Sequence, residues 1–258
     1  VVPPGPMTIA PVRDGETLRL DDAGVLHGAA RDIPFASEAG QIAVLARRGD
    51  ARVVALVKRA DCTLASGASL ARDAQDRVDF DGVTPILVEA APDGIDEAAL
   101  FSMGAAARAA QMAGALQAIL DISVEYAKER VAFERPIGKF QAVQHNLARL
   151  AGEAAASIAA AQSLAERIGR DGSFGDAVFV EVASAKIRVG EAAGEGASIA
   201  HQTHGAIGFT NEHILHRYTM RLWSWRDQFG SESHWAVRLG EHVAAAGADE
   251  LWPMVTAP

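Results

Sequence analysis

Residues 130–150 read RVAFERPIGKFQAVQHNLARL, and this stretch joins two long helical patterns. Tyr126 and Arg130 lie four residues apart, so they share one face of the helix that ends here. Pro136 then interrupts the helix, and an apolar repeat resumes at Gln141. On residue type alone, such an arginine more often caps the last carbonyl groups of its own helix. Beside a tight turn it is also well placed to clamp a phosphate or pyrophosphate.

Helical spacing continues on both sides of this junction. Before it, Met112, Leu116 and Ile119 recur at the period of a helix. After it, helices are predicted at about 141–169, at 174–204, from Thr210–Glu212 onward and at 231–246. The connections between them are short, which favours antiparallel neighbours and an up-down four-helix bundle.

The first third of the chain carries strand signals instead. Short alternating or apolar runs, bounded by Gly and Asp turn signals, lie at Thr17–Leu20, Ile42–Ala46, Val53–Val57 and Val83–Val88. The pattern changes at Pro92-Asp93-Gly94. The sequence therefore predicts an α+β multidomain fold, with a small antiparallel β domain at residues 1–91 followed by an up-down four-helix bundle at residues 96–250.

Composition argues against several classes of protein. The 258 residues carry a net charge of −9, which argues against nucleic acid as a partner. No apolar run approaches the roughly 20 residues that span a bilayer, so no membrane partner is expected, and neither is a signal peptide. The single cysteine, Cys62, rules out an internal disulfide. We interpret Cys62 as a small core residue of a cytoplasmic protein.

Two motifs resemble one known family. The pattern Tyr126-x-x-x-Arg130-x-x-Phe133, followed by a Q-x-x-Q that begins at Gln141, resembles the Y-x-x-x-R-x-x-F-G-x-x-I and Q-x-x-Q of acyl-CoA dehydrogenases. The stretch QTHGAIGFTNE at Gln202–Glu212 resembles that family's Q-x-x-G-G-x-G-(Y/F)-x-x-E. A weaker match at residues 24–46 resembles the strand pair of its middle domain. The resemblance implies that middle domain and the C-terminal helical bundle, without a counterpart of the family's N-terminal helical domain.

The resemblance also implies a cofactor, FAD. In the family, the bundle of one subunit contacts the FAD that its dimer partner carries. By this resemblance, Arg130 contacts the pyrophosphate and Phe133 packs nearby. Gln141, Gln202 and the backbone around Gly205 reach the adenosine part. The bundle is therefore expected to serve FAD binding and oligomerisation.

This sequence departs from the family pattern beside the same motifs. Glu134 replaces the usual Gly after the Phe, and Ala206 replaces the second Gly of the downstream motif. Glu134 adds negative charge close to a pyrophosphate, which Arg135 can offset.

The catalytic carboxylate of the family has no match. Its Glu removes the α-proton of the substrate while FAD accepts a hydride, and two positions in the family can supply it. Phe229 and Gly104 stand at these positions, and Ala105 replaces the neighbouring substrate-binding Arg. Glu232 is the one weak candidate for a base. It is alternatively a first-turn acidic residue of a helix that Ser231 caps.

Two further clusters receive structural interpretations. The histidines His201, His204, His213 and His216 lack a supporting carboxylate spacing, so no metal site is predicted. The tryptophans Trp223, Trp225 and Trp235 are more often core or interface anchors than residues that stack on a cofactor.

These features favour one function and leave two alternatives open. The favoured hypothesis is the subunit that lacks the catalytic Glu in a heteromeric FAD-dependent acyl-CoA dehydrogenase of steroid or bile-acid side-chain degradation, inactive alone. Its partners would be an acyl-CoA substrate, a second acyl-CoA dehydrogenase-like chain in a heterotetramer, and electron-transfer flavoprotein. The first alternative is an N-terminally truncated homotetrameric enzyme with Glu232 as base. The second is a catalytically dead scaffold homologue.

Overall fold

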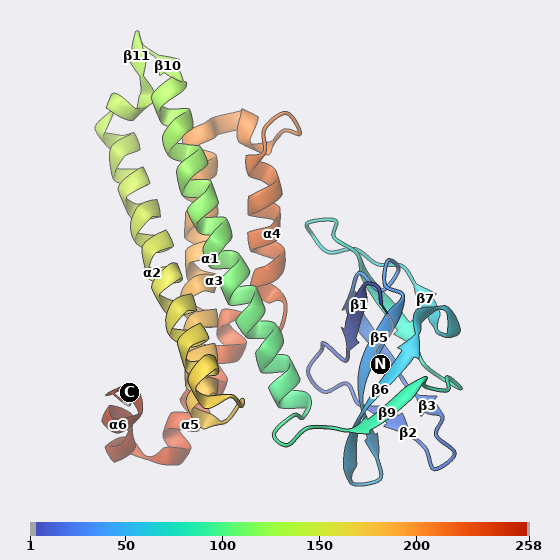
Figure 1. Ribbon diagram of the computed structural model, residues 1–258. Helices are drawn as coiled ribbons and strands as arrows, with labels where there is room; N and C mark the ends of the chain where they lie inside the picture. The colour runs from blue at the N-terminus through green and yellow to red at the C-terminus, as the bar shows by residue number, and fades with distance from the viewer. Residues whose placement is uncertain (1–3, 257–258) are drawn as a thin grey trace. The chain divides into compact units, whose positions relative to one another are not determined.

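A computed structural model of the chain describes residues 4–256, so residues 1–3 of the predicted β domain lie outside the described residues. The chain divides into two compact units, Val1–Gly104 and Ala105–Pro258. The strands of the first unit extend to Ala90 and the α-helices follow from Glu97, which confirms the predicted α+β class (Figure 1).

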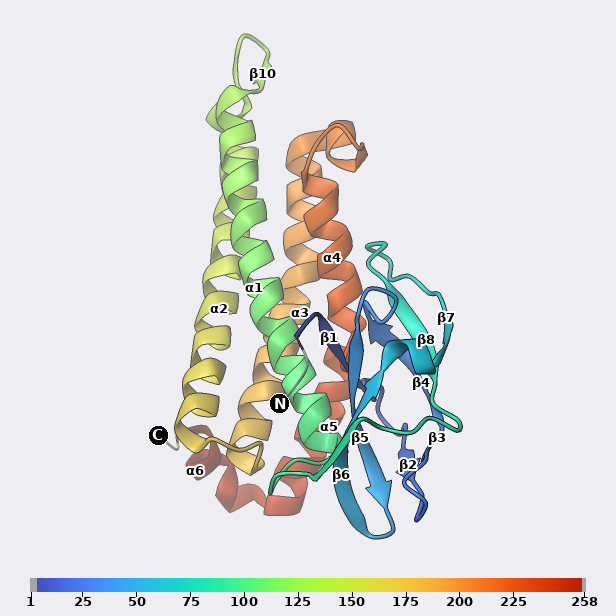
Figure 2. The ribbon, with the colours of Figure 1, turned by 45° about the vertical axis from the view of Figure 1, so that its right-hand side comes forward.

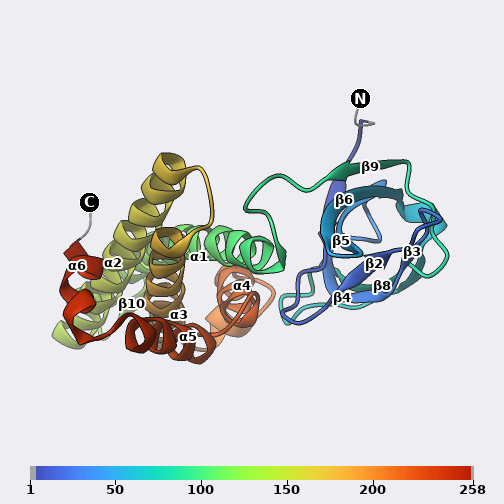
Figure 3. The ribbon, with the colours of Figure 1, turned by 90° about the horizontal axis from the view of Figure 1, so that it is seen from below.

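Within residues 4–104 the strands form two sheets. The larger sheet has the order β3-β2-β5-β6-β9, with β1 also paired to β5. Its strands are β1 (Met7–Ala10), β2 (Leu18–Leu20), β3 (Leu26–His27), β5 (Gln41–Arg48), β6 (Ala51–Lys58) and β9 (Leu87–Ala90). The smaller sheet has the order β4-β8-β7, with β4 (Ala29–Pro34), β7 (Thr63–Ala65) and β8 (Gln75–Asp79). Seen from below, these strands curve round a common interior (Figure 3).

Two details of the β unit differ from the prediction. The pairing is not purely antiparallel, because β1 and β2 both run parallel to β5. β1 pairs with Gln41–Val44 and β2 pairs with Ala46–Arg47. Parallel neighbours are joined by crossovers rather than hairpins, so local turn signals do not reveal them. The strand predicted at Val83–Val88 begins only at Leu87, since Pro85 cannot donate to a strand ladder.

The interior of this unit is apolar, but Cys62 is not part of it. Leu18 and Ile42 are almost fully buried there. Cys62 instead follows the short helix η1 (Arg59–Asp61), is half-buried, and has its Sγ 3.6 Å from the carbonyl oxygen of Lys58. Burial is the main cause that raises the pKa of its thiol to about 11, so the thiol stays protonated and unreactive. The interpretation of Cys62 as a core residue is therefore wrong.

The helices of the second unit begin with four that alternate in direction, as in an up-down bundle (Figure 2). They are α1 (Glu97–Glu129), which starts in the first unit, α2 (Gln141–Asp171), α3 (Asp176–His204), α4 (Leu215–Asp227), α5 (Glu232–Ala246) and α6 (Leu251–Thr256), with η4 (Ala248–Glu250) before α6. α3 packs against α2, α4 and α5, so it is the central helix of the unit. Among residues 4–256, we find no helix with the length and apolar character needed to cross a membrane.

The fourth helix begins later than predicted. α3 ends at His204, and Gly205 adopts a positive φ of 66°. Residues Gly205–Phe209 then form the short helix η3, whose last turn is closed by a hydrogen bond from the Thr210 N–H to the Ile207 carbonyl. The predicted start at Thr210–Glu212 is therefore a turn, and α4 begins at Leu215.

Small residues let the bundle helices pack closely. A β carbon on Gly196 would lie 2.6 Å from Cδ2 of Leu116 and 3.1 Å from Cδ1 of Leu150, so only glycine allows this approach. Trp235 of α5 is fully buried, and its indole N–H donates to the Phe229 carbonyl at 2.8 Å. Trp235 is thus a core residue and not an interface anchor.

Candidate functional site

The α1–α2 connection presents three of the predicted cofactor residues at its surface. It is a hairpin of β10 (Val131–Ala132) and β11 (Arg135–Pro136), followed by η2 (Ile137–Lys139). Arg130, Phe133 and Gln141 are all exposed, and Phe133 keeps 89% of its surface.

The tip of this hairpin has a strained backbone. Phe133 and Glu134 have positive φ angles of 51° and 65°. Positive φ at both central residues is the geometry of a tight primed turn, in which glycine is favoured. The glutamate that stands at a family glycine position therefore holds the tip conformation at some conformational cost.

Side-chain and main-chain contacts behind the tip fix the hairpin against the ends of α1 and α2. The guanidinium carbon of Arg135 lies 4.2 Å from the centre of the Phe140 ring, and a β carbon on Gly138 would lie 3.0 Å from the Ala127 carbonyl oxygen. The Ile137 N–H donates to the Arg130 carbonyl at 2.8 Å. Among the described residues, the Arg130 guanidinium has no ion-pair partner and makes no hydrogen bond to its own helix. The cap interpretation of this arginine therefore has no contact to support it.

Tyr126 links this end of α1 to the end of α3. Its hydroxyl donates to the His204 carbonyl at 3.3 Å, and the two rings stack with centroids 4.3 Å apart. Arg130, four residues further along, therefore belongs to the same end of the bundle as Gln202 and Gly205. The sequence showed only that Tyr126 and Arg130 share a helix face.

A pocket of about 730 Å³ lies between α3 and α4 and contains the other two predicted cofactor residues. It is lined by Gly194, Ser198, His201, Gln202, Gly205, Ala206, Phe209, Trp223 and Arg226. The His201 ring stacks on the Phe209 ring, with the two centroids 3.8 Å apart. It also lies nearly parallel to the Trp223 ring, with a centroid distance of 5.6 Å. Trp223 therefore faces the pocket and extends an aromatic wall.

Two buried histidines lie here, His201 in the lining of the pocket and His204 at the end of α3. His201 Nε2 lies 2.8 Å from the Thr219 hydroxyl, and His204 Nδ1 donates to the Ala200 carbonyl at 2.8 Å. His201 Nδ1 and His204 Nε2 are buried without a hydrogen-bond partner. Burial is the main cause that lowers the pKa of both rings. In the part of the chain that the structure describes, no group of three or more metal-ligating side chains exists.

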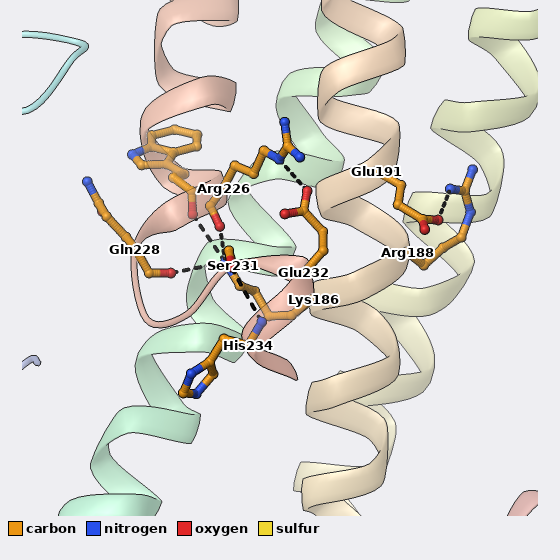
Figure 4. Close-up of polar contacts among 9 residues, drawn as sticks. Lys186, Arg188, Glu191, Arg226, Gln228, Ser231, Glu232 and His234 are labelled. Atoms are coloured by element: carbon orange, nitrogen blue, oxygen red, sulfur yellow. Dashed lines mark hydrogen bonds and ion pairs between the residues drawn. The ribbon is translucent and has the colours of Figure 1, made fainter. Parts of the chain in front are cut away.

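At the other end of α4, a buried lysine holds the turn into α5. Lys186 of α3 is fully buried, and its Nζ donates to the carbonyls of Trp225 (3.2 Å), Arg226 (3.0 Å) and Gln228 (3.0 Å) (Figure 4). An ammonium group has three donors, so all of them are used. Burial lowers the pKa of Lys186 to about 8, although the charges of Glu232 and Asp227 oppose this shift.

This lysine takes the place of a glycine cap. α2, α3 and α5 each end at a glycine whose backbone N–H closes the last turn. α4 instead ends at Gln228 in an extended conformation, and the Lys186 side chain satisfies its last carbonyls. The sequence signal was a lysine within the run VASAKIRVG, which also contains Arg188, and both charged residues read equally well as interruptions of an apolar run.

Glu232 lies directly after this turn, in the first turn of α5. The Ser231 hydroxyl accepts the His234 N–H at 3.4 Å, which is the N-cap arrangement that the sequence offered as an alternative to a catalytic role. The Glu232 carboxylate pairs with Nε of Arg226 (Figure 4). A β carbon on Gly190 would lie 2.6 Å from Glu232 Oε1, so the carboxylate lies directly against α3.

Neither family base position carries a carboxylate. Phe229 and Gly230 form the α4–α5 turn with positive φ angles of 53° and 88°. Gly104 of α1 and its neighbour Ala105 are buried. The turn therefore offers no group at position 229 that could accept a proton.

Comparisons with known proteins bear on this arrangement. The family model described as acyl-CoA dehydrogenase, C-terminal domain, matches residues 95–227. The chain is 38% identical over 117 residues to acyl-CoA dehydrogenase IpdE2 of Mycobacterium tuberculosis, a match that covers 44% of this chain and 33% of that protein. This chain thus spans about a third of the length of that curated relative, and its match to IpdE2 of Mycolicibacterium smegmatis covers 38% of the relative.

Solved structures share the fold of this chain. The ChsE4-ChsE5 complex from Mycobacterium tuberculosis superposes with a TM-score of 0.78 at 24% identity, over 94% of this chain and 67% of that one. A variant of the steroid ACAD Tcur3481-Tcur3483 superposes with a TM-score of 0.73 at 27% identity, over 94% of this chain and 63% of that one. The family resemblance seen in the two motifs is therefore confirmed.

Proposed function

Because the chain belongs to the acyl-CoA dehydrogenase family, we propose that it is a flavoprotein subunit in the α,β-desaturation of an acyl-CoA thioester. Within a heteromeric enzyme, it is the subunit that lacks the catalytic Glu. One observation carries this proposal: Phe229 and Gly104 occupy the two base positions, while the five residues that resemble FAD contacts remain. A subunit that helps to hold the cofactor but leaves proton removal to its partner would have this combination.

The residues at this end of the bundle fit FAD in kind. Arg130 supplies a cation that has no ion-pair partner among the described residues, and Gln202 supplies an amide at the wall of the pocket. Phe133 and Gln141 lie on the exposed hairpin and the start of α2, and Gly205 offers main-chain groups without a side chain. When bound, FAD supplies the hydride acceptor for the reaction.

Proton removal needs a base that this chain does not offer at the family positions. A general base has to lie within about 2.6–3.2 Å of the proton that it removes. Glu232 is committed to Arg226 and packed against Gly190, which supports a positional role for it. We therefore assign the base to a partner chain.

The relatives support the kind of partner and substrate. One similar structure is a complex of ChsE4 with ChsE5, and another is a steroid ACAD made of Tcur3481 and Tcur3483. By analogy, we propose that this chain pairs with a second acyl-CoA dehydrogenase-like chain in a heterotetramer. Its substrate would be a steroid or bile-acid side-chain thioester, its electron acceptor electron-transfer flavoprotein, and its location the cytoplasm.

One experiment tests the proposal. The chain is purified alone and together with a candidate partner chain of the acyl-CoA dehydrogenase family, and the visible absorbance of oxidised flavin is recorded. We expect flavin and dehydrogenase activity only in the complex. Activity of the chain alone would favour the homomeric enzyme, and a colourless complex would favour the scaffold homologue.

A further inference from the structure

Three aromatic rings, which we call the ring cluster, meet at the end of α1: Tyr126, His204 and His213. Tyr126 lies in the last turn of α1, His204 is the last residue of α3, and His213 lies in the turn before α4. The Tyr126 and His204 rings stack with centroids 4.3 Å apart, and the His213 ring lies 4.7 Å from the His204 ring. None of the three lines the α3–α4 pocket. The ring cluster therefore joins the end of α1 to the α3–α4 connection, outside that pocket.

The hydrogen bonds of both histidines leave no place for a second proton. Because a carbonyl only accepts, Nδ1 of the buried His204 carries the proton that it donates to Ala200. Its Nε2 is buried without a hydrogen-bond partner, so a proton added there would meet no acceptor. Nδ1 of His213 accepts the Leu215 N–H at 3.2 Å, and a proton added there would break this hydrogen bond. Both rings therefore have to be neutral for these contacts to form.

Few charged or titratable groups face the ring cluster, and none of them stabilises a protonated ring through an ion pair. α3 contributes His201, and α4 contributes His216. α1 contributes the Tyr126 phenol and, four residues further along the same face, Arg130. η3 carries no ionisable side chain. The turn before α4 contributes Glu212, which is exposed and, among the described residues, forms no ion pair with a histidine.

Protonation favours the released form of the ring cluster. Burial is the largest cause that lowers the pKa of His204, and the charge of His213 lowers it further, although the hydrogen bond to Ala200 opposes this shift. Burial also lowers the pKa of His201, and the charges of His204 and His216 act in the same direction. A ring with a lowered pKa takes up its proton more readily after release than while it is held. The held form is therefore most stable above the ordinary histidine pKa of about 6.5 and loses stability as the pH falls below that value.

We propose that the ring cluster is an acid-sensitive clamp, which holds the end of α1 against the α3–α4 connection at neutral pH and releases it in mild acid. The clamp keeps the segment that carries Arg130 beside the segment that carries Gly205. Tyr126 and His204 are thus positioning residues, because they fix these two segments without contacting a ligand. The consequence for flavin, which is lost when the clamp opens, rests on the proposed function. The clamp itself rests on the contacts of the three rings.

Hydrogen exchange of the full chain at about pH 7.5 and about pH 5.5 tests the clamp, with each rate corrected for the intrinsic effect of pH on amide exchange. A ring that stays neutral while held and takes up one proton when released shifts the opening equilibrium by about tenfold over this interval. We expect the protection of residues 124–130 and 200–216 to fall by at least about that factor in acid.

His204→Phe is the central variant, because it keeps a flat ring against Tyr126 and cannot take up a proton. It should remove about tenfold of the acid effect. His145→Gln is the matched control, since His145 is an exposed histidine of α2 and its loss should leave the acid effect unchanged. Tyr126→Phe removes the hydroxyl that donates to the His204 carbonyl. It should lower protection by about two- to tenfold at both pH values, which is the behaviour of a contact that does not titrate.

A second titrating ring protects the test against a folding defect in His204→Phe. His213→Asn keeps an acceptor for the Leu215 N–H but cannot be protonated in this range, so it should also reduce the acid effect. Circular dichroism at neutral pH confirms the helical content of each variant. The clamp is overturned if wild-type protection of these segments is the same at both pH values, or if a folded His204→Phe or His213→Asn keeps the whole acid effect.

Flavin retention by the purified complex, measured over the same pH interval, tests the positioning role. We expect wild-type flavin to be lost together with protection in acid, and His204→Phe to retain it. Flavin that stays bound while the clamp opens would overturn the positioning role. An acid effect on protection in a chain whose complex is colourless at neutral pH would refute the proposed function and leave the clamp standing.

Discussion

The two ends of α4 use charged side chains in opposite ways. At the end shared with the α1–α2 hairpin, Arg130 and Phe133 are exposed, and the Arg130 guanidinium has no ion-pair partner among the described residues. At the α4–α5 turn, Lys186 is saturated by three carbonyls and Glu232 is neutralised by Arg226. The hairpin end therefore leaves a cationic and an aromatic side chain accessible to a ligand or a partner chain. The turn satisfies its charges internally, apart from the pocket side of Arg226.

Because of this difference, the charged residues of the α4–α5 turn stabilise the turn and are poorly placed for proton transfer. A catalytic base needs a carboxylate that is free to approach substrate and that has a suitable pKa. At the turn, the carboxylate is buried against α3 and paired, and position 229 carries an aromatic ring.

The largest effect is expected for Lys186→Met. Three partly buried carbonyls lose their charge-assisted donor, so the free energy of unfolding should fall by about 4 kcal/mol. Chemical denaturation measures this change. The control is Lys128→Met, because Lys128 pairs with Glu125 on the surface and should contribute less than about 1 kcal/mol. Equal stability of the two variants would mean that the turn does not depend on Lys186.

Arg130→Ala should release flavin from the oligomer while the fold persists. The lost contact to a partly buried pyrophosphate would cost about 2–4 kcal/mol, or tens- to several-hundredfold in affinity. Arg130→Lys should recover only part, because lysine cannot present the bidentate fork. Flavin content after gel filtration measures the effect, with Arg149→Ala as a control at a surface pair with Glu195. Unchanged flavin in Arg130→Ala would restore the helix-cap interpretation.

Lys186 also predicts a pH dependence of stability. Its pKa is about 8 when folded and about 10.5 in its ordinary range. Between these values the unfolded chain binds the proton and the folded chain does not, so the free energy of unfolding rises with pH in this window. The gap between the two values corresponds to at most about 3 kcal/mol. Urea unfolding at steps from pH 7 to about 10.5 should show the rise in the wild type relative to Lys186→Met, and parallel profiles would refute it.

The smallest effect is expected for Glu232→Gln. A true general base contributes about 10²–10⁴-fold, so its replacement by an amide would be obvious in the rate. We expect the activity of the complex to remain within about threefold, because Glu232 serves Arg226 rather than the substrate. Steady-state rates with flavin content held equal provide the measurement. Abolished turnover with flavin and assembly retained would identify this chain as the catalytic one.

The bundle could be predicted from the sequence with good accuracy. Helix period and local end signals are properties of neighbouring residues, so the spans of α2, α3 and α5 agree with the prediction to within a few residues. Pro136 and Gly138 located the α1–α2 junction. The motifs around Arg130 and Gln202 identified the family for the same reason, since each is a short run of consecutive positions.

Contacts between residues far apart in the chain determined the strand pairing, the burial of side chains and the partners of the site residues. The parallel pairing of β1 and β2 with β5, the burial of Trp235, and the meeting of Tyr126 with His204 each join segments far apart in the chain. Lys186 is the clearest case, because its partners lie about 40 residues away on another helix. Sequence fixes residue type and helical phase, which are local. Burial and partners depend on which surfaces pack together, and only the tertiary structure assigns those.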